Sequence, residues 1–242
     1  MPNVPKWIAD QMENLLPSKY LKVEVSAITK YSPEIKKVTF SADLQYVDFY
    51  PGTAMIFRVS DTALRHYTPS AFDKKAGTFE IIFHIHRNGP GSNLADNLLP
   101  GDRLKVSMPA GKKLYDRGKR SHFFFGDETS LSFYAILQEE ISGNNQSSHG
   151  IFELDAINQN IPKELGYDMK IVPKTPEDPG KEAINLLEGF LNEHAGLLKQ
   201  SIFYLTGNVA SVQRFRTALK QHGISSGNIK LQGYWSEGIA GL

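Results

Sequence analysis

The tetrapeptide Arg65-His66-Tyr67-Thr68 places a cation, an aromatic ring and a hydroxyl within four residues. Side chains alternate along a strand, so Arg65 and Tyr67 are expected on the same face if the segment is extended. A guanidinium pairs with a phosphate in bidentate fashion, a tyrosine ring packs against another ring, and a threonine hydroxyl donates to a ring nitrogen. The segment therefore suits a phosphorylated aromatic ligand, although an ordinary edge strand often carries the same residues.

A second segment, Gly89-Pro90-Gly91-Ser92, precedes a helix that we predict over residues 92–98, with Ser92 near its cap. Helix N-termini carry unpaired N–H groups and a partial positive charge, which suit a diphosphate, and glycine lets the backbone approach a ligand. A plain turn into a helix would have a similar sequence. Together the two segments provide for the ring and the diphosphate of a dinucleotide flavin, so we predict bound FAD.

Two further glycine segments each lie between a predicted strand and a predicted helix: Gly126-Asp127-Glu128-Thr129 and Thr206-Gly207-Asn208. In a doubly wound domain, ligands bind at the carboxyl ends of the strands. We expect Thr129 or Ser130 to cap the helix after the first segment. That segment is weak as a phosphate loop, because it lacks the Gly-x-Gly-x-x-Gly pattern and its two carboxylates repel an anion. Each segment alone is also compatible with a structural role.

The predicted elements that carry these residues change in type near Gly118. Before it, a helix is predicted over residues 6–16, and apolar residues then alternate with polar ones in runs separated by proline and glycine turns. This pattern is typical of a small antiparallel barrel, for which we predict six strands. The clearest runs begin at Leu21, Val38, Met55, Phe79 and Leu104.

After Gly118, short apolar runs alternate with helical patterns, which favours a doubly wound parallel sheet. Strands are predicted over residues 122–125, 151–154, 169–172, 201–205 and 229–231, and the longer helices over 181–194 and 209–222. We therefore predict two domains, residues 1–117 with the N-terminal helix and the barrel, and residues 118–242 with the α/β fold.

Composition excludes several classes of protein. Lys plus Arg number 27 against 26 for Asp plus Glu, so the basic excess typical of nucleic-acid binding is missing. The chain has no cysteine, which excludes disulfides, thiolate metal sites and cysteine nucleophiles. His84 and His86 share a strand face, but we interpret them as half-buried strand residues or as lining of the flavin site, and predict no metal.

No apolar run reaches the ~18–20 residues of a membrane span, and the N-terminal segment lacks the apolar core of a signal peptide. We therefore expect a cytoplasmic protein with no membrane partner. The oligomeric state stays open, with a monomer as the working expectation.

The chain resembles the siderophore-interacting proteins, a branch of the ferredoxin-reductase-like flavoproteins. The resemblance rests on the segments above, on Pro100-Gly101-Asp102 and on the near-terminal Gly233-Tyr234-Trp235. It implies FAD in the barrel domain, NADH or NADPH in the α/β domain, and reduction of ferric siderophores with release of ferrous iron.

The resemblance also implies roles for single residues. Arg65 would meet the FAD phosphates, Tyr67 would stack on the flavin, and Thr68 would contact its reactive ring nitrogen. The other residues expected to bind cofactor are His84, His86, Asn88, Gly91, Ser92, Gly126, Asp127, Thr129, Gly207, Tyr234 and Trp235. The last two could instead close the core. The chain departs from the family at Asn208, where many relatives carry Glu, and at Arg87-Asn88, which replaces a Gly-Asp pair.

Ferric siderophores are often anionic, so a basic rim is expected to bind them. Lys112, Lys113 and Arg117 lie in the predicted linker and are our candidates, although a solvated linker would have the same composition. Asp155 follows a predicted strand and favours NADH, because its carboxylate would repel a 2′-phosphate. Two other functions stay open, a general NAD(P)H-dependent flavin or quinone reductase and a non-catalytic flavin- or siderophore-binding protein.

Overall fold

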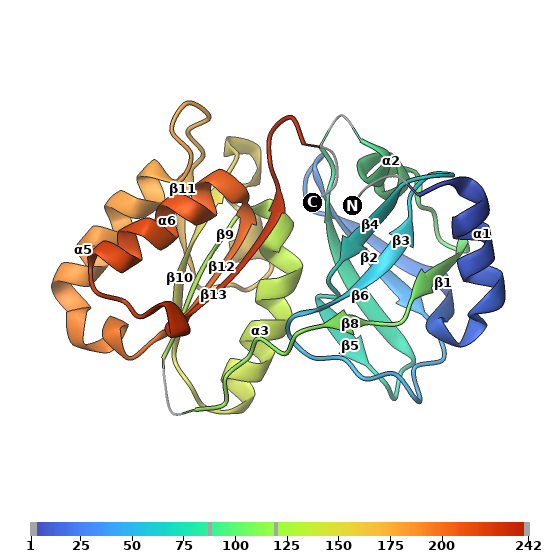
Figure 1. Ribbon diagram of the computed structural model, residues 1–242, viewed down its shortest axis with the longest axis horizontal. Helices are drawn as coiled ribbons and strands as arrows, with labels where there is room; N and C mark the ends of the chain where they lie inside the picture. The colour runs from blue at the N-terminus through green and yellow to red at the C-terminus, as the bar shows by residue number, and fades with distance from the viewer. Residues whose placement is uncertain (1–3, 87–88, 119–120, 240–242) are drawn as a thin grey trace. The chain divides into compact units, whose positions relative to one another are not determined.

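The computed structural model describes residues 4–86, 89–118 and 121–239 of the chain. The fold divides into two compact units, the first ending at Leu114 and the second beginning at Tyr115 (Figure 1). Each unit has its own hydrophobic core.

The first unit is an antiparallel sheet with two helices, α1 (Lys6–Leu15) and α2 (Pro90–Asn97). Its strand order is β4-β3-β7-β1-β2-β6-β5, and β8 pairs with β3. The strands are β1 (Tyr20–Lys30), β2 (Ile35–Ser41), β3 (Thr53–Arg58), β4 (Leu64–Tyr67), β5 (Ala71–Asp73), β6 (Thr78–His84), β7 (Arg103–Ser107) and β8 (Ala110–Gly111).

The predicted antiparallel sheet is confirmed, and its described part contains eight strands instead of six. The short strands β5 and β8 have three and two residues. Segments of that length cannot show an alternating pattern, so the sequence does not reveal them.

Alternation places one side of each long strand in the core of the first unit. On β2, Val38 and Phe40 are fully buried, whereas the alternating residues Lys37 and Thr39 are partly exposed. The Phe40 ring stacks on Phe79 of β6 with 5.0 Å between centroids. Burial of such rings is the main source of stability for this unit.

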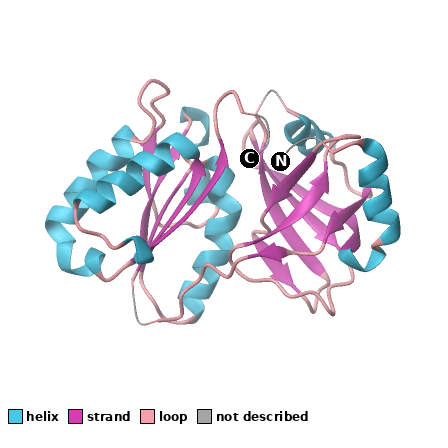
Figure 2. Ribbon diagram, in the orientation of Figure 1, coloured by secondary structure: helices cyan, strands magenta, loops and turns pink. Residues whose placement is uncertain are grey.

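The second unit is a five-stranded parallel sheet in the order β11-β10-β9-β12-β13, with helices on both faces (Figure 2). The strands are β9 (His122–Gly126), β10 (Ser148–Leu154), β11 (Lys170–Pro173), β12 (Ile202–Asn208) and β13 (Ile229–Trp235). The helices are α3 (Leu131–Gly143), α4 (Ile161–Glu164), α5 (Lys181–Lys199) and α6 (Val209–Gln221), with the short 3₁₀ turn η2 (Glu128–Ser130) before α3.

Successive phenylalanines of β9 pack on opposite faces of this sheet. Phe125 stacks on Phe215 of α6, whereas Phe124 packs against Phe133 and Tyr134 of α3. A strand covered on both faces is apolar throughout, which explains the unbroken run His122–Phe125. The predicted doubly wound sheet is confirmed. Within the described ranges, no helix is both long and apolar enough to cross a membrane.

Candidate functional site

In the first unit, β4 lies directly against the first turn of α2. A Cβ atom placed on Gly91 would lie 2.4 Å from Tyr67 Oη and 3.4 Å from Arg65 Cγ. Only glycine therefore fits at position 91 while both β4 side chains keep their places. The structure thus brings together the two segments that the sequence singles out, through Arg65, Tyr67 and Gly91.

Tyr67 is held by the aromatic core of the first unit. Its ring meets Phe83 edge-on with 4.7 Å between centroids, and it meets Phe57 in the same way at 5.3 Å. Burial raises the pKa of Tyr67 to about 12, although the nearby Arg65 opposes the shift. The phenol therefore stays protonated at neutral pH and can act as a hydrogen-bond donor.

The first turn of α2 differs from the expected one in its cap. The N-cap is Gly89, with φ +145° and no side-chain cap. Ser92 lies inside the helix, where its Oγ accepts a hydrogen bond from the backbone N–H of His86 at 3.1 Å. The helix begins at Pro90, because the first helical position needs no N–H donor. The N-cap is therefore three residues before Ser92, which the sequence predicts to lie near the cap.

Three other residues predicted to bind FAD lie at or just after the ends of β4 and β6. Thr68 directly follows β4 and is partly buried, and His86 is exposed just before α2. His84 ends β6, where its Nε2 lies 3.9 Å from Glu34 Oε2. The His84 and His86 ring centroids are 6.0 Å apart. Asn88 lies outside the described residues.

These residues fit FAD by the chemistry they offer. The first N–H groups of α2 have no partner within the helix, and no acidic residue lies in its first turn. The Arg65 side chain passes that turn with its Cγ, while its Nη1 donates to Leu64 O at 2.8 Å, and the Ser92 hydroxyl can still donate its own proton. The junction of β4 and α2 thus places a helix N-terminus next to a tyrosine ring, an arrangement compatible with a dinucleotide flavin.

In the second unit, Asp127 ties together the carboxyl ends of three strands. It is 2% exposed and follows β9 directly. Its carboxylate accepts from the N–H and hydroxyl of Thr129, and from Asn208 N and Trp235 Nε1 at 2.8 and 2.7 Å. Asp127 is therefore the cap of η2, whereas Ser130 occupies the N-cap position of α3, as expected, without a side-chain capping bond.

The glycines predicted at this edge are needed for close packing. Gly207 has φ +107°, and a Cβ on it would lie 2.6 Å from the Asp127 carboxylate carbon. A Cβ on Gly126 would lie 2.6 Å from Ser130 Cβ. Both glycines therefore make room for Asp127 and for the turn into α3, and Asn208 caps α6 by accepting from Ala210 N and Ser211 N.

Sequence reasoning missed a buried charge cluster beside Asp127. Glu128 has no exposed surface and accepts from Asp155 N at 2.7 Å, and Lys174 Nζ lies 2.5 Å from Glu128 Oε2 and 2.8 Å from Asp155 Oδ2. Burial raises the pKa of Glu128 to about 7, against the attraction of Lys174. The Lys174 ammonium also lies 5.9 Å from the centre of the Trp235 ring.

A second buried carboxylate was also missed. Glu153 of β10 is 3% exposed and accepts from Gly180 N and Ser211 Oγ, each at 2.7 Å. Burial raises its pKa, while these two hydrogen bonds oppose the shift. The only signal in the sequence is an acidic residue within the otherwise apolar run Gly150–Leu154.

These bonds bear on a second cofactor in the second unit. Diphosphates bind to free N–H groups at helix N-termini, but Asp127 already accepts from Thr129 N in η2, and Asn208 from Ala210 N and Ser211 N in α6. Part of the donors at the two turns expected to meet a nicotinamide nucleotide is thus already used within the protein. Tyr234 and Trp235, the last residues of β13, are partly buried and remain the aromatic surface at this edge.

The three basic residues predicted to bind substrate differ in setting. Lys112 and Lys113 follow β8 in the first unit and are exposed. Arg117 belongs to the second unit, where its Nη2 lies 3.9 Å from Glu140 Oε2. A chelate would compete with Glu140 for Arg117 but not with a described carboxylate for the two lysines.

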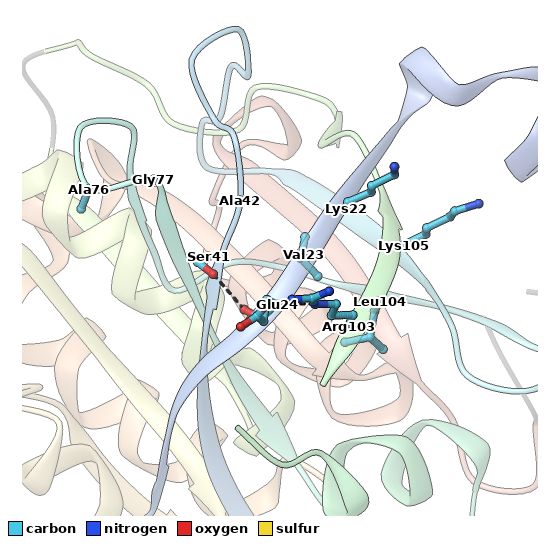
Figure 3. A pocket seen from close by; sticks show the side chains of 10 residues that line it. All are labelled: Lys22, Val23, Glu24, Ser41, Ala42, Ala76, Gly77, Arg103, Leu104 and Lys105. Atoms are coloured by element: carbon cyan, nitrogen blue, oxygen red, sulfur yellow. Dashed lines mark hydrogen bonds and ion pairs between the residues drawn. The ribbon is translucent and has the colours of Figure 1, made fainter. Parts of the chain in front are cut away.

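A hollow of about 790 Å³ lies elsewhere on the first unit, bordered by β1, β7 and the turn between β5 and β6 (Figure 3). Lys22 and Lys105, which are cross-strand partners, extend from the same side of it. None of its lining residues belongs to α2 or to the segment Arg65–Thr68. The hollow is therefore separate from the proposed flavin site.

Comparison with known proteins identifies both parts of the chain. Residues 22–115 match the family model of the oxidoreductase FAD-binding domain, and residues 119–238 match that of the siderophore-interacting proteins. One curated relative, NADH-cytochrome b5 reductase 1 of Dictyostelium discoideum, is 34% identical over 56 residues, which cover 23% of this chain and 20% of that protein.

Solved structures share the whole fold. A siderophore-interacting protein from Acinetobacter baumannii superimposes with a TM-score of 0.74 at 17% identity, covering 91% of this chain and 92% of its own. A siderophore-interacting protein from Aeromonas hydrophila gives 0.73 at 21% identity, covering 92% and 93%. With an FAD-binding oxidoreductase domain followed by the second matching domain, the chain belongs to the siderophore-interacting protein family.

Proposed function

We propose that the protein is an FAD-dependent reductase that takes electrons from NADH or NADPH and passes them to a ferric siderophore, releasing ferrous iron. The observation that carries the proposal is the contact of Arg65 and Tyr67 with the first turn of α2, within a domain that matches the FAD-binding oxidoreductases. The relatives named as siderophore-interacting proteins and as an NADH-dependent reductase support the acceptor and the donor.

The side chains of the first unit would bind and orient the flavin. Arg65 and the N-terminus of α2 would hold its phosphates, the Tyr67 ring would pack on the isoalloxazine, and Thr68 would donate to a ring nitrogen. When bound, FAD supplies electron exchange in single or paired steps, which no side chain of this cysteine-free chain offers. The protein itself contributes binding, orientation and electrostatics.

For the donor, we propose NADH in preference to NADPH. Asp155 lies at the carboxyl end of β10, where a carboxylate accepts from a ribose hydroxyl and repels a 2′-phosphate. Lys174, the nearest cation, is already paired with Asp155 and Glu128. It is therefore not free to bind a 2′-phosphate.

The test is an anaerobic spectrum of the purified yellow protein. We expect NADH to bleach the flavin absorbance, and ferric tris-catecholate to restore it while a ferrous chelator develops colour. Bleaching followed by reoxidation with menadione but not with the ferric chelate would identify a quinone reductase. If neither NADH nor NADPH bleached the flavin, the protein would be a non-catalytic flavin- or siderophore-binding protein.

The same assay tests the basic residues. Replacing Lys112 and Lys113 by alanine should raise KM for the anionic chelate several-fold, because exposed charges steer anions, and FAD content should stay unchanged. An unaltered KM would reject their role in substrate binding.

A further inference from the structure

The first unit buries a lysine beneath the far end of α2. Lys36 is 2% exposed, although lysine is almost never fully buried without partners. On β2 it is in phase with Val38 and Phe40, whose side chains enter the core. A lysine at a core-facing position requires a specific reason, because burying an ammonium is costly.

The partners of Lys36 are all backbone carbonyls at the end of one helix. Its Nζ donates to Ala95 O at 2.8 Å and to Asp96 O and Leu98 O at 2.9 Å each. These groups belong to the last turn of α2, whose carbonyls have no partner within the helix. One ammonium therefore satisfies three carbonyls at once and fastens the C-terminus of α2 to β2.

Within the part of the chain that the structure describes, no carboxylate lies in hydrogen-bonding contact with the Lys36 ammonium. Burial and then Lys30 lower its pKa, whereas Asp96 and Asp102 act in the opposite direction from a distance. A cation at a helix C-terminus offsets the negative end of the helix dipole, so the field at the N-terminus becomes more positive. The eight residues of α2 span only about 12 Å, so both ends act on the same small region.

We propose that Lys36 is a positioning residue for FAD: by holding the C-terminus of α2, it sets the N-terminal turn against Arg65 and Tyr67 and favours the diphosphate there. This inference rests on the proposed placement of the FAD diphosphate at α2. Apolar contacts of Ala95 and Leu98 with the core fix the distance of α2 from the sheet. The three directed bonds from Lys36 fix its rotation and axial position.

The experiment compares FAD with riboflavin, which has the ring but no phosphate. Apoprotein of the full chain is titrated with each flavin, and quenching of flavin fluorescence gives the two Kd values. In Lys36→Met we expect FAD to bind about tenfold more weakly or worse, and riboflavin within about twofold of wild type. The ratio of the two Kd values isolates the ADP portion of FAD, which contains the diphosphate, from any general loosening of the unit.

The matched control is Lys37→Met, one residue away on the same strand. The Lys37 side chain faces the other side and pairs with Glu80 at 3.1 Å. This variant should keep the wild-type ratio even if it lowers thermal stability. Lys36→Gln keeps two N–H donors and should give a ratio of the FAD and riboflavin Kd values between those of wild type and Lys36→Met. If the methionine variant does not fold, the glutamine variant is compared with wild type instead.

The outcomes distinguish the positioning role of Lys36 from the placement of the FAD diphosphate at α2. Equal weakening of FAD and riboflavin in the Lys36 variants, or no change in either, would overturn the positioning role and leave the flavin site in place. A wild-type protein that binds FAD no more tightly than riboflavin would overturn the placement of the diphosphate at α2, and the role of Lys36 with it.

Discussion

Glu128 is a carboxyl group with no exposed surface, and its ionisation controls part of the stability of the second unit. Its pKa is raised from 4.5 to about 7, first by burial. A folded-state pKa above the unfolded value means that the native protein binds the proton more tightly between these two values. The stabilisation present below about pH 4.5 is therefore lost as the pH rises to about 7.

Replacing Glu128 by glutamine should flatten this part of the stability profile. The amide imitates the protonated acid, so wild type and Glu128→Gln should differ least near pH 5. Between pH 5 and 8, wild type should lose on the order of 2–3 kcal/mol more than the variant. Urea unfolding at each pH measures the difference.

The exposed Glu139→Gln is the control for the loss of one charge on this unit. Glu153, with its raised pKa, and His122, whose pKa burial lowers, titrate in both proteins and cancel in the comparison. Parallel profiles for wild type and Glu128→Gln would show that Glu128 is ionised throughout.

Some contacts between single residues can be predicted from the sequence, and others cannot. Alternation places Arg65 and Tyr67 on one strand face, and the glycine at position 91 marks a close approach, so their meeting is predictable. The pairing of Glu128 with Lys174 is not, because it depends on β9 and β11 lying two strands apart in one sheet. Lys36 is in phase with the core residues of β2, but a lysine at a strand end is usually exposed.

Among the elements, β9, β12 and β13 depend on one side chain. Four donors converge on the Asp127 carboxylate, from Thr129, Asn208 and Trp235. An asparagine offers one oxygen and adds a donor of its own. Asp127→Asn therefore leaves at least two donors without an acceptor, which costs about 2–3 kcal/mol.

The change should be visible in Trp235, because Trp7 is the only other tryptophan of the chain. In a Trp7→Phe background, Asp127→Asn should shift the emission of Trp235 to longer wavelength and increase its quenching by acrylamide. Asp168→Asn, at an exposed position of the same unit, should change neither. If Asp127→Asn also left the emission unchanged, Asp127 would not be what holds the indole.

The ends of strands are harder to predict from the apolar sequence pattern than the strands themselves. The parallel strands are predictable because apolar runs covered on both faces are unmistakable. β13 extends to Trp235, beyond the predicted end at Leu231, because Gln232 and Gly233 interrupt the apolar pattern while the strand continues beside β12. The near-terminal aromatic residues therefore belong to the sheet edge.

For the whole molecule, two cores imply two unfolding events. The described clusters draw on separate residue sets, one from β1, β2, β3, β6, β7 and α2, the other from the parallel sheet with α5 and α6. A ligand that binds one folded unit stabilises that unit by RT ln(1 + [L]/Kd), about 2.7 kcal/mol at a hundredfold excess over Kd. FAD and NADH should therefore act on different transitions.

Differential scanning calorimetry of the apoprotein should resolve two transitions. FAD should raise the midpoint of one by several degrees and leave the other in place, and NADH should do the reverse. In the Trp7→Phe background, emission of Trp235 follows the second unit and assigns the transition that NADH raises. If FAD shifted the transition that Trp235 follows, or if both ligands shifted one common transition, the assignment of one cofactor to each unit would be wrong.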